Sequence, residues 1–215
     1  MRLLFILAAA SLLYAAAGCK SSSSKAPKTF CDTACFTDTL KFTGEGNFSP
    51  YVYVAAANCK PSKIIRSYKG MGANLTIDFG FDQVNVNKDF IRCLMKDTSS
   101  AYLLFNDCMT GRGYQVKLPF NKTGTISKRA SGINSIDPKF TVAPDMIAYT
   151  DRGNIYVEQV GSGKKAMMTF GKMLDIDYDA LHEYIDTVNV TSDRIWVKVK
   201  VDDKWTEIEK KITLE

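Results

Sequence analysis

The sequence contains almost no histidine. His182 is the only one among 215 residues, which excludes metal or catalytic sites built from several imidazoles. With 46% hydrophobic and 24% charged residues, the composition is that of an ordinary globular protein. It therefore excludes a disordered chain, a coiled coil and a multipass membrane protein, and the length suffices for one domain, or two small ones, with a buried core.

The first eighteen residues have the pattern of a secretory signal peptide. Arg2 is their only charge, and the apolar run of residues 3–13 is followed by small residues up to Gly18. This order is typical of signal peptides, and the run is too short to span a bilayer permanently. We therefore expect residues 1–18 to be a signal peptide that is removed.

The end of this segment, Ala16-Ala17-Gly18-Cys19, resembles the lipobox of bacterial lipoproteins. In that family the cysteine is acylated and becomes the first residue of the mature chain. The family usually has leucine three residues before the cysteine, where this chain has Ala16. The resemblance implies lipidation of Cys19, and the alternative is a soluble secreted protein cut after an Ala-x-Ala site.

Residues 19–29 have the composition of a flexible tether. They are rich in Ser, Lys and Pro, so they cannot bury enough apolar surface to offset the entropy lost on ordering. Lys20, and not aspartate, follows Cys19. By the sorting pattern of the lipoprotein family, this implies an outer membrane lipoprotein. Its lipid anchor would hold it to the membrane, with the body, residues 30–215, facing the periplasm.

The remaining cysteines are expected to form disulfides, because an oxidising compartment favours them. If Cys19 carries lipid, five cysteines remain and one has no partner; otherwise six could form three bonds. Spacing does not determine connectivity, and our prediction pairs Cys93 with Cys108, and Cys59 with Cys31 or Cys35. The candidate disulfide cysteines are Cys31, Cys35, Cys59, Cys93 and Cys108.

A thiol or metal site at Cys31 and Cys35 is a separate hypothesis. Their Cys-x-x-x-Cys spacing is similar to that of thioredoxin-like copper chaperones. Such proteins need a βαβ context and a histidine at a set distance. Here no βαβ pattern follows, and His182 lies far along the chain.

The body is predicted to be all-β, built from antiparallel hairpins, because alternation of apolar and polar residues dominates it. The clearest hairpin joins residues 194–201 to 204–209 through Asp202-Asp203. This register places Val197 opposite Ile208 on an apolar face. Trp196 and Trp205 fall on the polar face, where they form a candidate partner surface.

Other hairpins are predicted at residues 146–160 and 101–120, and strand starts recur at spacings that suit propeller blades. Gly153 and Asn154 are expected to supply the positive φ of the turn in the first of these. Residues 140–157 resemble one blade of a TolB-type propeller. The resemblance implies a propeller-like ring, and a β-sandwich is the alternative.

A dense acidic cluster precedes the last hairpin. Its oxygens fall at positions 1, 3, 5, 9 and 12 of a calcium loop, although Ala180 and His182 occupy positions that normally hold Gly and an aliphatic residue. Apolar residues alternate with the aspartates, which favours a strand with one solvent-exposed face. The same carboxylates could form a glycosidase pair. The cluster comprises Asp175, Asp177, Asp179, Glu183 and Asp186.

Charge and motifs indicate a binding protein more than an enzyme. Residues 20–130 hold 16 Lys and Arg against 8 Asp and Glu, which suits an anionic lipid or polysaccharide, but no basic and aromatic interleaving marks a nucleic-acid face. No Gly-x-Ser-x-Gly motif accompanies His182, and no cofactor is indicated. The sequence predicts a lipid-anchored, non-enzymatic binding or scaffold module for an envelope protein or glycan. The alternatives are an envelope hydrolase or carbohydrate-processing enzyme using the acidic cluster, and the thiol or metal protein.

Overall fold

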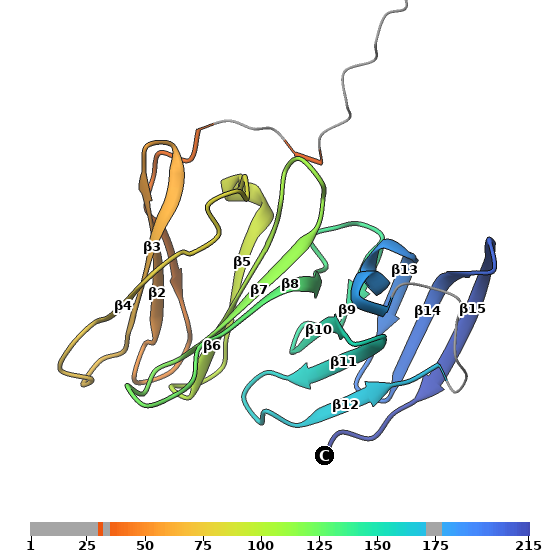
Figure 1. Ribbon diagram of the computed structural model, residues 1–215. Helices are drawn as coiled ribbons and strands as arrows, with labels where there is room; N and C mark the ends of the chain where they lie inside the picture. The colour runs from red at the N-terminus through yellow and green to blue at the C-terminus, as the bar shows by residue number, and fades with distance from the viewer. Residues whose placement is uncertain (1–29, 32–34, 171–177) are drawn as a thin grey trace, which may run out of the picture.

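The computed structural model describes residues 30–31, 35–170 and 178–215, which form an all-β body (Figure 1). Two short 3-10 helices, η1 (Lys88–Phe90) and η2 (Tyr178–Glu183), interrupt the strands. Within the described ranges, no helix has the length and apolar character needed to cross a membrane. The strands are β1 (Leu40–Thr43), β2 (Tyr51–Ala57), β3 (Lys60–Ser67), β4 (Leu75–Asp78), β5 (Ile91–Met95), β6 (Ser100–Asn106), β7 (Gly113–Pro119), β8 (Ser127–Ile133), β9 (Phe140–Val142), β10 (Met146–Asp151), β11 (Asn154–Gln159), β12 (Lys165–Met168), β13 (Ile185–Val190), β14 (Arg194–Val201) and β15 (Lys204–Lys211).

These strands form three sheets. The first has the order β1-β2-β3-β4, the central one β12-β11-β10-β8-β7-β6-β5, and the third β15-β14-β13-β9. All pairs are antiparallel except β9 with β13. The all-β prediction is confirmed. The propeller-like ring is not, because the repeat units that begin at β6 and β10 share one sheet and do not form separate blades.

The sheets stack as β layers (Figure 1), and two hydrophobic cores lie between them. The first core joins the first sheet to β5–β7, and the second core joins β10–β12 to the third sheet. Both follow the period-2 pattern, in which alternate residues of each strand face inward. The first core includes Val52, Val54, Ile64, Leu103, Phe105 and Val116, and the second includes Ala148, Val157, Val188, Ile195 and Val197.

The central sheet curves so that its two halves face each other. The Tyr102 hydroxyl on β6 donates to Glu158 Oε1 on β11 at 2.5 Å. Four strand spacings separate these strands, which in a flat sheet amounts to about 19 Å. Leu104, Ile147 and Val160 pack with Tyr102 in a third, central cluster. Strand β6 is therefore buried on both faces.

The turn residues of one predicted hairpin lie where the sequence placed them, whereas those of another are shifted by one residue. Strands β14 and β15 pair in the predicted register, with φ of 48° and 60° at Asp202 and Asp203. In the β10–β11 hairpin the turn residues are Arg152 and Gly153, with φ of 45° and 75°. Asn154 already belongs to β11, because it pairs with Asp151 across the two-residue turn.

The disulfides join Cys31 to Cys108 and Cys35 to Cys59, and the predicted Cys93–Cys108 bond is wrong. Cys93 on β5 pairs with Leu103 on β6, so Cys108 lies five residues farther along the chain, roughly 17 Å in extended conformation. A disulfide requires Cα atoms within about 7 Å. Among the described cysteines, Cys93 is the one with a free thiol.

Candidate functional site

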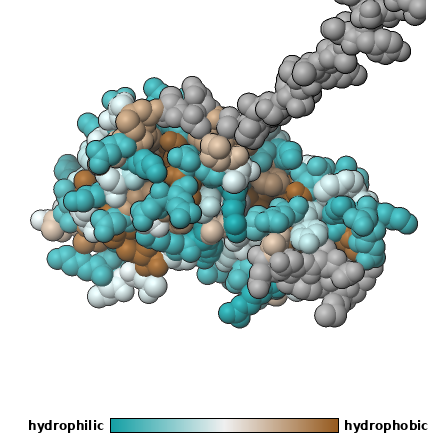
Figure 2. Space-filling view, turned by 45° about the horizontal axis from the view of Figure 1, so that its top comes forward, coloured by the Kyte–Doolittle hydropathy of each residue, from teal (hydrophilic) through white to brown (hydrophobic). Residues whose placement is uncertain are grey.

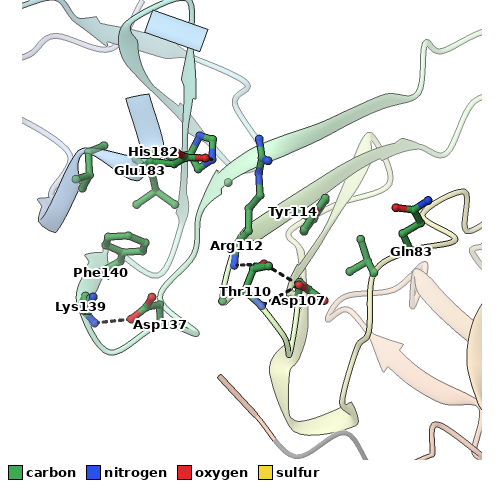
Figure 3. Close-up of a pocket in the computed structure, with 16 residues that line it drawn as sticks. Gln83, Asp107, Thr110, Arg112, Tyr114, Asp137, Lys139, Phe140, His182 and Glu183 are labelled. Atoms are coloured by element: carbon green, nitrogen blue, oxygen red, sulfur yellow. Dashed lines mark hydrogen bonds and ion pairs between the residues drawn. The ribbon is translucent and has the colours of Figure 1, made fainter. Parts of the chain in front are cut away.

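A cavity of about 530 Å³ lies where the two cores meet, lined by the loops around β7, the turn before β9, and η2 (Figure 3). Val84 of the first core and Ile133 of the second both line it. Its volume falls within the range of small-molecule sites, roughly 300–1,000 Å³. Because its walls come from both halves of the molecule, it is the candidate functional site.

The loop that follows β6 is held by Asp107. Its carboxylate accepts hydrogen bonds from the backbone N–H groups of Asn85 at 3.0 Å and Thr110 at 2.9 Å, and from the Thr110 hydroxyl at 2.7 Å. Burial alone would raise the pKa of Asp107, but these hydrogen bonds outweigh it and hold the pKa below its usual range. The Asp107 carboxylate is therefore already occupied in shaping the wall, and its backbone N–H donates to the Arg112 carbonyl oxygen at 2.9 Å.

Arg112 and His182 approach each other from opposite sides of the cavity (Figure 3). Arg112 donates from Nε to the Ala130 carbonyl oxygen at 2.5 Å, which fixes its guanidinium. His182 Nε2 lies 3.7 Å from the Glu183 carboxylate, whereas its buried Nδ1 has no hydrogen-bond partner among the residues that the structure describes. Burial and the Arg112 charge lower the pKa of His182, with Glu183 opposing them in part. The imidazole is therefore neutral at pH 7.

A further part of the cavity wall comes from the turn between β8 and β9. The Lys139 backbone N–H donates to Asp137 Oδ1 at 3.0 Å, and Phe140 begins β9 beside them. The Tyr114 ring, on β7, stacks on Phe105 of the first core at 5.5 Å. The cavity thus combines two aromatic rings with cations, carboxylates and a neutral imidazole, a set that suits a polar ring-shaped ligand.

Only part of the predicted acidic cluster lies within the described residues. Asp175 and Asp177 lie outside the described residues, as does the side chain of Asp179. Glu183 lines the cavity, whereas Asp186 on β13 forms an ion pair with Lys198 at 3.5 Å. In the part of the chain that is described, no three His, Cys, Asp or Glu side chains are grouped to hold a metal ion. The calcium loop stays a prediction.

None of the other predicted site residues that the structure describes lines the cavity. Trp205, on β15, is 50% exposed, with the Lys198 ammonium 6.0 Å from the centre of its ring. Trp196, on β14, pairs with Glu209 on β15. Cys31 and Cys35 are each bonded to a different cysteine, so neither is a thiolate ligand in this structure. Cys19 lies outside the described residues.

Sequence reasoning missed most of the cavity wall. Arg112 and Tyr114 flank Gly113 at the start of β7, whereas Asp137 and Lys139 come from the turn between β8 and β9, and no local motif joins the two pairs. The one available signal was the Thr-Gly-Arg-Gly stretch at residues 110–113, in which glycines flank a charged residue between two strands. Gly113 is required because a Cβ there would meet the Gly132 carbonyl oxygen.

Comparison of the chain with protein family models, with curated proteins and with solved structures finds no match in any of the three.

Proposed function

We propose that this chain is a lipid-anchored envelope protein whose β body binds a glycan segment in the cavity between its two cores. The observation that carries the proposal is the cavity itself, whose walls combine Tyr114 and Phe140 with charged and neutral polar groups. Aromatic faces cover the C–H faces of sugar rings, and planar polar side chains match hydroxyl groups.

The charge of the cavity supports a neutral ligand. Arg112 and Lys139 are countered by Asp137 and Glu183, and the Asp107 carboxylate is already hydrogen-bonded within its loop. An anionic ligand would meet carboxylates, and a cationic one would meet the guanidinium. A polyhydroxylated sugar avoids both penalties and uses donors and acceptors of either sign.

The anchor is supported by the first nineteen residues and by the cysteine inventory. Two disulfides suit an oxidising compartment such as the periplasm. Together with the free Cys93 they account for five of the six cysteines, which leaves Cys19 for the lipid. Metabolic labelling with an alkyne fatty acid tests this directly. The wild type should be labelled and C19A should not, and an unlabelled wild type contradicts the anchor.

Glycan binding is tested by sedimenting the unlipidated C19S chain with purified peptidoglycan. The wild-type cavity should bind saturably, and R112Q should weaken binding at least tenfold, because it removes a charged donor fixed at the wall. K164Q is the matched control, since Lys164 is an exposed cation in the turn after β11. Equal binding by R112Q and K164Q, or no binding by the unaltered cavity, rejects the glycan assignment.

A carbohydrate-processing enzyme is the second candidate, because Glu183 and Asp137 place two carboxylates in the same cavity. The variant E183Q separates the two functions. An enzyme would release reducing ends from the glycan and lose that turnover in E183Q while keeping its binding. A binding module releases none in either form. Reducing-end assays on both proteins therefore decide between them.

A further inference from the structure

A second cavity, of about 540 Å³, lies between η1–β5 and the β9–β10 segment. Ile133 lines both this cavity and the candidate site, so the two are neighbours. Its floor is the central cluster, with Leu104 and Ile147. Its walls are mainly aliphatic, from Leu94, Ile136, Val142 and Pro144. The chemistry of this space differs from that of the glycan cavity beside it.

The polar residues inside this second cavity are already satisfied. The Asn134 side-chain amide donates to the Phe105 carbonyl oxygen at 3.1 Å and to Asn106 Oδ1 at 2.9 Å. The Ser135 hydroxyl lies within hydrogen-bonding distance of the Val142 backbone N–H and carbonyl oxygen, at 3.3 and 3.4 Å. An apolar ligand entering here therefore displaces water without leaving these polar groups unpaired.

The charged residues of this lining, Asp89 and Arg92, are both exposed, which places them at its rim. Arg92 donates from Nη1 to the carbonyl oxygens of Asp89 at 2.7 Å and Ile91 at 2.9 Å, which fixes the guanidinium at the mouth. Asp89 lines the same mouth, and its backbone N–H donates to Asn87 Oδ1 at the start of η1. The rim thus presents one cation and one anion, which complement a head group that carries both charges.

The position of the rim along the chain places it close to the proposed anchor. The Phe30 ring lies edge-on to Phe90, a wall residue of the cavity, with centroids 5.2 Å apart. From Phe30 back to Cys19 the chain reaches at most about 38 Å. If Cys19 is lipidated, as the proposed function requires, the mouth stays near a bilayer surface. The face in Figure 2 is mainly hydrophilic, with hydrophobic residues visible in patches between the hydrophilic ones.

We propose that this second cavity binds one acyl tail of a membrane phospholipid whose zwitterionic head group lies at Asp89 and Arg92. The aliphatic walls match a lipid tail. The phosphate meets Arg92 and the ammonium meets Asp89. A free lipid fits better than the chain's own anchor, because an acyl chain on Cys19 carries neither phosphate nor ammonium and leaves the rim charges unmatched.

The test uses the full-length mature chain with C19S, which has no acceptor for an anchor, so its outcome is independent of lipidation. The probe is palmitoyl lysophosphatidylethanolamine, and its binding is measured by the displacement of a fluorescent fatty acid from the protein. Saturable one-to-one binding is expected. I136W, which fills the cavity, should weaken binding at least tenfold. I65W is the control, since Ile65 lies on β3 outside this cavity.

Head-group recognition is tested by R92A. It should weaken binding of the lysophospholipid several-fold and leave binding of uncharged palmitoylglycerol unchanged. Absence of saturable binding by C19S, or equal binding by I136W and I65W, overturns the proposal. Binding by C19S with none by the lipidated wild type also overturns it, because the chain's own acyl group would then occupy the cavity.

Discussion

Glu158 shows how much one side chain contributes to holding this molecule closed. Its carboxylate is fully buried, accepts from Tyr102 at 2.5 Å and Lys117 at 2.6 Å, and lies 3.6 Å from Lys165. Burial alone would raise the pKa of Glu158, but the Lys117 and Tyr102 hydrogen bonds outweigh it and lower the pKa. These contacts link β11 to β6 and β7, so they connect the two halves of the central sheet.

We expect E158Q to lower the free energy of unfolding by about 2–3 kcal/mol, because it removes a buried, charge-assisted hydrogen bond. A carboxylate whose pKa is lowered by folding contributes stability at pH values above its unfolded-state pKa, about 4.3. This contribution is lost as the pH falls through the folded-state pKa. The difference between E158Q and wild type should therefore shrink in acid. Urea titrations from pH 7 downward measure it, with exposed E207Q as control. A difference that is constant with pH contradicts the ion-pair explanation.

At the scale of elements, the close approach of β7 and β8 shapes the cavity wall. A Cβ at Gly113 would meet the Gly132 carbonyl oxygen, so only glycine permits this approach. The same end of β7 has a register shift between Gly113 and Gln115. Arg112 and Tyr114, on either side of Gly113, reach the cavity because the strands meet here.

G113A should separate these strands, lower stability by more than about 2 kcal/mol and abolish binding in the cavity. G163A is the matched control. Gly163 has a φ of +70°, but an added Cβ would meet nothing within 4 Å. G163A therefore carries backbone strain alone, about 1 kcal/mol. Thermal unfolding and peptidoglycan sedimentation compare the two variants, and similar losses in both would show that contact at Gly113 is not decisive.

Across the whole molecule, the covalent links lie in the first half. Cys31 and Cys108 are 77 residues apart, and Cys35 and Cys59 are 24 apart. Closing loops of these lengths stabilises a fold by about 3–5 kcal/mol each in the chain-entropy model. The N-terminal lead-in is therefore tied to the chain just after β6, and the second half, which has no cysteine beyond Cys108, is held by non-covalent contacts.

The cysteine state predicts a thiol count. Burial raises the pKa of the Cys93 thiol, so native protein should resist alkylation. In denaturant, without reduction, a lipidated chain should take one alkyl group, on Cys93, and after reduction five. An unlipidated chain should take six after reduction, because Cys19 then carries no lipid. Intact mass measurement before and after alkylation distinguishes the cases, and rapid alkylation of native protein contradicts the raised pKa of the Cys93 thiol.

The sequence by itself determined the all-β class, the hairpins and the β14–β15 register. Each depends on residues close together along the chain. The register that pairs Val197 with Ile208 on the apolar face also pairs Lys198 with Glu207 on the polar face. Only the tertiary structure decided that Cys108 bonds to Cys31, that Glu158 meets Tyr102, and that Glu183 shares a cavity with Arg112. These pairs lie far apart in sequence. They meet because the central sheet curves and the cores pack, which no local pattern encodes.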